Sequence, residues 1–176
     1  MLRFHDLLNW FLSRKPVGMG PMKTLETGHT APEFTLELAS GGSLSLAEIL
    51  ARGPALFVFY KYSCPTCQLA LPFLDRLQGG TFQVFAICQN GEEEVREFND
   101  AFDIELPTLL DRAASGYPVS NAFAITHVPS LFLVEPDRGI SWSWVGFHKA
   151  KFEELSARAG RAIFRNGERV PEAKPG

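Results

Sequence analysis

The sequence predicts an α/β domain in which helices join parallel strands and an antiparallel hairpin completes a central mixed sheet. Six consecutive apolar residues, Ala55–Tyr60, are typical of a central strand that is covered on both faces. Strand-like and helix-like segments alternate around this run, which is the order expected of parallel strands with helical crossovers. Further along, the tetrapeptide Pro-Asp-Arg-Gly at 136–139 separates two apolar runs and predicts a hairpin turn.

The other elements follow from apolar periodicity and from turn and cap residues. Glu33–Leu38 alternates apolar and polar residues, as a half-buried strand does. Ser45 and Glu48 have the spacing of a capping box, which predicts a short helix. Further strands are predicted over Phe82–Cys88, Thr108–Leu110, Leu131–Glu135 and Ile140–Val145. Further helices are predicted over Gln68–Leu77, from a cap at Asn90 to about Phe102, over Ser120–Phe123, and over Lys149–Ile163 with Asn166-Gly167 as its end.

Four segments are expected along the 176 residues. Residues 1–15 repeat apolar side chains at helical spacing, which predicts an amphipathic helix that packs on the domain or on a partner. Residues 16–27 form a linker rich in Pro and Gly, 28–165 form the α/β domain, and 166–176 form a flexible tail. Three alternatives stay open for the first segment: a helix lying on a membrane surface, a degenerate secretory signal, and a true start at Met22.

Composition limits the classes of function. The chain is 45% hydrophobic and 21% charged, which suits one globular domain with its own core. A net charge of −3 gives no electrostatic reason to expect a nucleic-acid partner. No segment is long and apolar enough to span a membrane. Without a convincing export signal, the expected compartment is the cytoplasm and the expected role that of a reductase, although an exported form would change this interpretation.

The most informative motif is Cys64-Pro65-Thr66-Cys67, which follows the central strand and opens a helix. The N-terminus of a helix carries unpaired backbone N–H groups and a partial positive charge, so it favours a thiolate over a thiol. Pro65 suits the first helical position, where a missing N–H costs nothing. Two intervening residues place both sulfurs within reach of each other across one turn. The motif therefore predicts dithiol redox chemistry.

Two simpler interpretations of the motif compete with redox chemistry. A C-x-x-C pair can be half of a zinc site, but such sites show a second pair or a spaced histidine. Only Cys88 remains here, and the four histidines are scattered singly. The motif could also be two inert buried cysteines. Its place between strand and helix favours the redox interpretation without a metal, and Cys88 is best interpreted as a buried strand residue rather than a resolving cysteine.

Three further motifs accompany the dithiol. Residues 28–34 read G-H-T-A-P-E-F, Pro72 follows Cys67 by five positions, and residues 127–130 read H-V-P-S before a strand. Together they resemble the thioredoxin fold, and more closely its redoxin branch, which contains TlpA-like thiol–disulfide oxidoreductases and AhpC/TSA proteins. The resemblance covers about residues 28–163. It implies a thioredoxin-like fold, a mixed sheet flanked by helices, with the redoxin-type insertion and an extra N-terminal helix.

The resemblance implies a role for each residue of the site. Cys64 would be the attacking nucleophile, and Cys67, one turn further and more buried, would resolve the mixed disulfide. Pro129, if cis, would present the backbone of Val128 to a substrate chain for strand-like pairing; the alternative is an ordinary trans proline at a strand entry. Pro65–Thr66 would tune the reduction potential and face the substrate. No cofactor and no metal are implied.

The sequence also departs from the family pattern. The tryptophan that usually precedes the first cysteine is replaced by Ser63. Val58 stands where thioredoxins carry a buried acid, and Ala70 where many TlpA-like proteins have one. A water molecule or another residue must therefore take the proton from the second cysteine. Lys61 or His127 could tune the thiol electrostatically, or each could be a surface neighbour.

Three functions follow, in order of preference. The first is thiol–disulfide exchange with a disulfide-containing protein or a small thiol substrate, with an upstream dithiol reductant. The second is a peroxidase in which Cys64 becomes a sulfenic acid and Cys67 or Cys88 condenses with it. Peroxiredoxins carry P-x-x-x-T-x-x-C, and Lys61 stands at the threonine position relative to Cys64. The third is a redox-regulated binding module that uses the N-terminal helix, with membrane contact through that helix as a further possibility.

Overall fold

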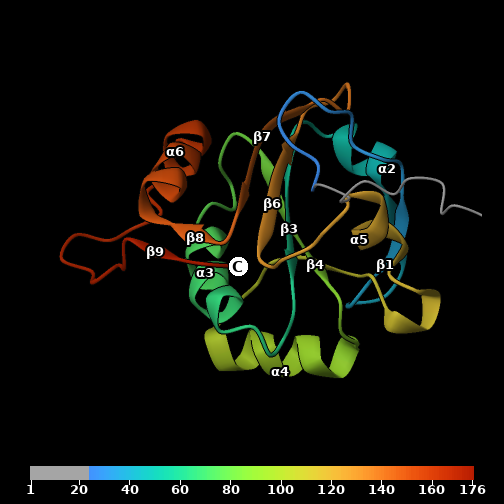
Figure 1. Cartoon of the computed structure of the whole chain (residues 1–176), viewed down its shortest axis with the longest axis horizontal. Helices are drawn as coiled ribbons and strands as arrows, with labels where there is room; N and C mark the ends of the chain where they lie inside the picture. The colour runs from blue at the N-terminus through green and yellow to red at the C-terminus, as the bar shows by residue number, and fades with distance from the viewer. Residues whose placement is uncertain (1–23) are drawn as a thin grey trace, which may run out of the picture.

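The computed structural model describes residues 24–176, in which helices cover both faces of a seven-stranded sheet (Figure 1). The strand order is β2-β1-β5-β4-β3-β6-β7. The helix predicted over 1–15, the alternative start at Met22 and most of the linker predicted over 16–27 lie outside the described residues.

The central strand β3 (Ala55–Tyr60) pairs in parallel with β4 (Gln83–Cys88) and antiparallel with β6 (Ser130–Val134). The sheet continues on one side through β5 (Thr108–Leu110), β1 (Thr35–Leu38) and β2 (Ser43–Ser45), and on the other through β7 (Ile140–Val145). β6 and β7 form the hairpin predicted around 136–139. The predicted mixed sheet is therefore confirmed.

Alternation along β3 divides the core between the two faces of the sheet. All six residues of this strand are buried. Leu56, Val58 and Tyr60 share a core cluster with residues of α3 (Pro65–Asp75), α4 (Glu92–Phe102) and α6 (Lys149–Ala159). Ala55, Phe57 and Phe59 share a second cluster with α2 (Leu46–Leu50) and α5 (Pro118–Ala122). The continuous apolar run thus serves two cores at once, as a central strand requires.

Local signals account for several element boundaries. Ser45 caps α2 as predicted: its Oγ accepts from the Glu48 N–H at 3.2 Å, and the Glu48 carboxylate accepts from the Ser45 N–H at 2.8 Å. α3 runs through Pro72 without interruption. A 3₁₀ turn over Ala113–Ser115 precedes α5.

Several predicted helix ends were wrong. α3 ends at Asp75 rather than Leu77, and α5 covers Pro118–Ala122 rather than Ser120–Phe123. α4 is capped by Gly91 rather than Asn90, whose side chain accepts from the backbone of a distant loop instead. The last helix, α6, ends at Gly160, which adopts the left-handed conformation at φ 64°, and not near Asn166-Gly167. A glycine at this position stops a helix because it enters that conformation without steric cost.

The segment after α6 returns to the domain. β9 (Ala173–Lys174) pairs antiparallel with β8 (Phe147–His148), the short strand before α6. Earlier in the segment, the guanidinium of Arg76 at the end of α3 holds the carboxylate of Glu168 through two bonds of 2.8 and 2.9 Å. Flexibility of the tail over 166–176 stays a prediction, and several residues within it have hydrogen-bond partners in the structure.

The pair between Arg76 and Glu168 predicts a pH dependence of stability. Hydrogen bonds from the Arg76 side chain, and then from the Arg165 N–H, lower the pKa of Glu168 from 4.5 to about 2. The pKa of Glu168 is depressed in the folded state. The contribution of the pair to the free energy of unfolding is therefore present above about pH 4.5 and is lost as the pH falls toward 2. In urea unfolding, the stability difference between the wild type and Glu168→Gln should shrink between pH 5 and pH 3. A difference that stays constant over this range would contradict the linkage.

Candidate active site

Cys64 is the N-cap residue of α3, and its sulfur is held in place by the backbone. Its Sγ accepts from the N–H of Cys67 at 3.2 Å, so the sulfur sits among the unpaired N–H groups of the first turn. Pro65 occupies the first helical position, as the sequence predicts. Cys64 is partly exposed, whereas Cys67 is fully buried. A reagent from solvent can therefore reach the first sulfur and not the second.

A second loop faces this sulfur. The thiol of Cys64 donates to the backbone oxygen of Val128 at 3.4 Å, and the peptide bond between Val128 and Pro129 is cis. The oxygen of Pro129 in turn accepts from the N–H of Gly146 at 2.8 Å. Because β6 begins at Ser130 and pairs with β3, the sheet brings this loop beside the dithiol although the two are 64 residues apart.

Asn90 shapes the loop before the dithiol, a role that sequence reasoning missed. Its Oδ1 accepts from the N–H of Tyr62 at 2.9 Å, and the side-chain amide of Gln68 donates to the oxygen of Tyr62 at 3.1 Å. Tyr62 is thus held both from the segment after β4 and from α3. An Asn two residues after a strand is the available signal, but the sequence pattern predicts it as the cap of the following helix.

Burial dominates the electrostatics of the other two cysteines. It raises the pKa of Cys67 far above its ordinary value, with a smaller opposing effect from the backbone N–H of Lys61. Burial also raises the pKa of Cys88 to about 11, against a hydrogen bond from the Asn90 N–H. Both side chains belong to one core cluster with Tyr60, whose hydroxyl is buried and has no hydrogen-bond partner. At neutral pH the second sulfur of the motif is therefore a thiol.

Among residues 24–176, the core cluster that contains Cys67 holds no carboxylate. Val58 and Ala70, which stand at the two positions where the family resemblance implies an acid, are fully buried. Asp111 is a buried carboxylate, but its oxygens accept from the N–H groups of Val119 and Ser120 at 3.2 and 2.6 Å. Both oxygens of this carboxylate are thus hydrogen-bonded to the first turn of α5. The expectation that water or another group takes the proton from Cys67 is consistent with this arrangement.

The two basic candidates lie at the surface. Lys61 and His127 are both exposed and, together with Val128, line a small pocket of about 210 Å³. The ring of His127 has a contact of 3.1 Å with the Thr126 hydroxyl. Neither basic group has a hydrogen bond to Cys64 among the described residues. Their influence on the thiol stays a prediction.

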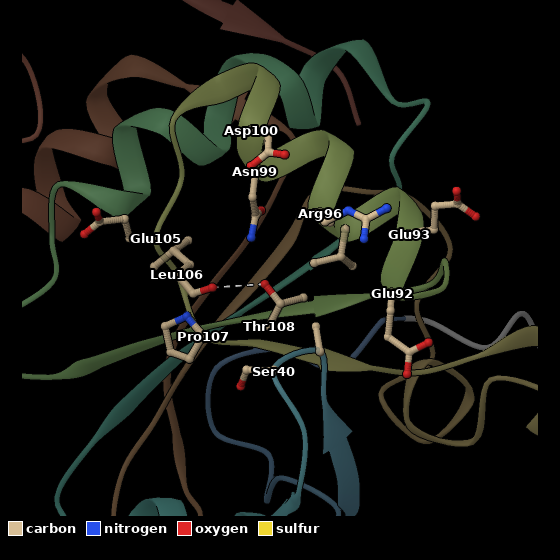
Figure 2. A pocket seen from close by; sticks show the side chains of 12 residues that line it. Ser40, Glu92, Glu93, Arg96, Asn99, Asp100, Glu105, Leu106, Pro107 and Thr108 are labelled. Carbon is tan, nitrogen blue, oxygen red and sulfur yellow. Dashed lines mark hydrogen bonds between the residues drawn. The ribbon is translucent and has the colours of Figure 1, made fainter.

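A larger pocket, of about 860 Å³, lies away from the sulfurs. Figure 2 shows that it lies between α4 and the start of β5 around Thr108, with acidic and basic side chains at its rim. Its lining contains no cysteine and no histidine. In residues 24–176 no group of three His, Cys, Asp or Glu side chains is arranged to hold a metal ion. The same residues contain no helix with the length and apolarity needed to cross a membrane.

Comparison with known proteins agrees with this geometry. "Thioredoxin-like protein YneN" of Bacillus subtilis is 24% identical over 136 residues, which cover 73% of this chain and 72% of that protein. "Thiol-disulfide oxidoreductase ResA" of the same organism is 23% identical over 121 residues, 65% of each chain. A Mycobacterium tuberculosis protein named as a candidate peroxiredoxin is 33% identical over 91 residues, 49% of this chain and 58% of that one.

Solved structures and a family model identify the fold and the family. A candidate DsbE thiol:disulfide interchange protein from Chlorobium tepidum superposes with a TM-score of 0.66 at 22% identity, and the match covers 76% of this chain and 95% of that chain. This likeness confirms the thioredoxin-like fold. The model of the AhpC/TSA family matches residues 27–143, which include the dithiol and the Val128–Pro129 loop. The chain belongs to the AhpC/TSA family.

Proposed function

We propose that the protein is a thiol–disulfide oxidoreductase that exchanges electrons between the Cys64/Cys67 dithiol and the disulfide of a protein or small molecule. The observation that carries this proposal is the asymmetry of the motif: one sulfur is accessible at a helix N-terminus, and its partner is buried one turn away. The relative named as a thiol–disulfide oxidoreductase supports the same chemistry.

The reaction proceeds in two exchanges. The Cys64 thiolate attacks one sulfur of the substrate disulfide, so that a mixed disulfide forms and the other substrate sulfur leaves as a thiolate. Cys67 then attacks the Sγ of Cys64, which forms the internal disulfide and releases the second substrate sulfur. Two electrons and two protons pass to the substrate, and an upstream dithiol reductant restores the pair. No cofactor takes part in these steps.

Proton transfer in the second exchange follows from the surroundings of Cys67. This thiol is buried without a carboxylate nearby, and its pKa is raised. The substrate thiolate that leaves in the first exchange is a base formed at the site itself. We therefore assign to it, or to a water molecule beside it, the proton that Cys67 must lose.

The roles of the surrounding residues follow from their contacts. The oxygen of Val128 lies against the reactive sulfur, so a substrate chain that pairs with this backbone brings its disulfide to Cys64. Pro129 sets the direction of that backbone. Pro65 and Thr66 are the first two residues of α3, directly after Cys64, and we assign them contact with the substrate.

Redox titration tests the proposal. The protein is equilibrated in glutathione and dithiothreitol buffers, and the fraction with an internal disulfide is measured, with Cys64→Ser as control. A potential near about −270 mV would support a reductase suited to the cytoplasm. A value near about −120 mV would identify an oxidant and overturn the expected compartment. Failure to form the internal disulfide would overturn the exchange mechanism.

Peroxidase activity is the second candidate function, favoured by the family and by the relative named as a peroxiredoxin. The Cys64 thiolate would be oxidised by a peroxide to a sulfenic acid with release of an alcohol or water, and Cys67 would condense with it to a disulfide and water. Lys61 at the threonine position of the peroxiredoxin motif weighs against it. Peroxide consumption coupled to a dithiol reductant distinguishes the two, because an exchange enzyme shows no peroxide-dependent turnover.

Compartment and partners remain proposals. The cytoplasm is the compartment proposed from the sequence, and the reduction potential bears directly on it. One structure with the same fold belongs to a protein described as a secreted Mycobacterium tuberculosis disulfide oxidoreductase. A disulfide-containing protein is the proposed substrate, and a dithiol protein is the proposed electron donor.

A further inference from the structure

The last residues of the chain lie beside the dithiol. β9 pairs with β8 so that Lys174 lies opposite Phe147, and the N–H of Lys149 donates to the oxygen of Glu172 at 2.8 Å. Beyond β9, the hydroxyl of Thr66, inside the redox motif, donates to the oxygen of Pro175 at 2.7 Å. Figure 1 shows β9 running toward α3, with the end of the described chain next to that helix.

Gly146 makes this approach possible. A β-carbon on Gly146 would lie 2.8 Å from the oxygen of Lys174 and 2.9 Å from the nitrogen of Gly176, closer than real β-carbons come. The absence of a side chain at this position therefore lets the tail backbone run directly over it. On its other side, Gly146 donates its N–H to the oxygen of Pro129. The tail thus lies directly against the backbone that supports the proline loop.

The end of the tail also lies close to the backbone oxygen of Val128. A β-carbon on Gly176 would lie 3.2 Å from the oxygen of Val128, the oxygen to which the Cys64 thiol donates. Residues 172–176 are otherwise exposed, so they are held along one side only. Their contacts are backbone pairing, the bond from the Thr66 hydroxyl and an ion pair of 3.9 Å between Lys149 and Glu172. Any extended peptide could make the first two in their place.

We propose that residues 172–176 occupy, within the same molecule, the position beside β8 and Thr66 that receives the extended segment of a substrate polypeptide. The inference rests on the proposed function and assigns to it a polypeptide substrate that pairs with β8 and accepts from Thr66. The tail competes with that segment. A tethered segment acts at an effective concentration on the order of millimolar, so it lowers the apparent affinity for peptides. A small disulfide reaches Cys64 without pairing to β8 and is affected less.

Two variants with a matched control test the inference. Lys174→Pro removes a backbone N–H from β9, whereas Lys174→Ala keeps it; a chain ending at Pro171 lacks the segment altogether. We expect Lys174→Pro and the shortened chain to reduce a disulfide-linked peptide with a kcat/KM at least about threefold above the wild type, because the competing state is removed. Lys174→Ala should match the wild type. The rate with glutathione disulfide should change less than the rate with the peptide in every variant.

Two readouts do not depend on turnover. Hydrogen exchange at the Lys149 N–H reports release of the tail, and alkylation of Cys64 by a bulky maleimide reports access. We expect both to be faster in Lys174→Pro and in the shortened chain. Unchanged alkylation and unchanged peptide kinetics in the shortened chain would overturn the inference. If no variant exchanges disulfides, the proposed function fails, while the alkylation rates still decide whether the tail restricts access to Cys64.

Discussion

Replacing Cys64 with serine is expected to reduce disulfide exchange by at least about a thousandfold, because a hydroxyl cannot replace the attacking thiolate. Folding should be preserved, since serine is among the best N-cap residues and can accept from the same N–H of Cys67. Turnover of a disulfide-linked peptide measures the loss, and urea unfolding verifies the fold. Substantial remaining turnover would exclude Cys64 as the nucleophile.

The two other cysteines provide the matched controls. Cys67→Ser should stop the reaction after the first exchange, so that a mixed disulfide between Cys64 and the substrate accumulates and is visible by mass spectrometry. Cys88→Ala should retain exchange, because this buried thiol takes no part in the proposed steps. If Cys88→Ala also trapped the mixed disulfide, the resolving role would pass from Cys67 to Cys88.

Replacing Phe98 with alanine is expected to lower the free energy of unfolding by about 3–5 kcal/mol. The ring is fully buried on the inner face of α4 and packs against Tyr60, Tyr62 and Phe102, with ring centroids 5.0, 6.3 and 4.8 Å away. Its removal leaves a cavity under the loop that precedes the dithiol. Urea unfolding at neutral pH measures the change, and exchange kinetics show whether that loop is still held.

Phe102→Ala is the control for this substitution. Phe102 lies at the end of the same helix and is only partly buried. Removing its ring therefore leaves a smaller cavity and loses less buried apolar surface. A smaller loss is expected than for Phe98→Ala. Equal losses would show that the position of Phe98 under the loop has no particular importance and that the aromatic cluster acts as a whole.

Elements with strong local signals were predicted best. The observed bounds of β3, β5 and β7 are those predicted, because a continuous apolar run or a flanking turn is visible in a few neighbouring residues. The capping box of α2 is likewise a relation between residues three apart. These features need no knowledge of the rest of the chain.

Features that depend on distant contacts could not be predicted in the same way. Asn90 was assigned to a helix cap, and only the fold shows that its partner is the backbone of Tyr62, 28 residues away. The partner of Thr66 is 109 residues away in a segment without periodicity. The dithiol itself was predicted from its motif, whereas the contact between Cys64 and Val128 required the family resemblance, since nothing local joins residues 64 positions apart.

Thr66 combines an observed contact with the tail and the proposed role of tuning the reduction potential. The dipeptide inside such a motif is the usual place to adjust a reduction potential, yet in this protein the same side chain also anchors the end of the chain. A substitution of Thr66 that is meant to alter the reduction potential will therefore also change how the tail limits access of a substrate polypeptide. Thr66→Ser keeps the hydroxyl and Thr66→Val keeps the shape, so the pair separates thermodynamic tuning from steric control.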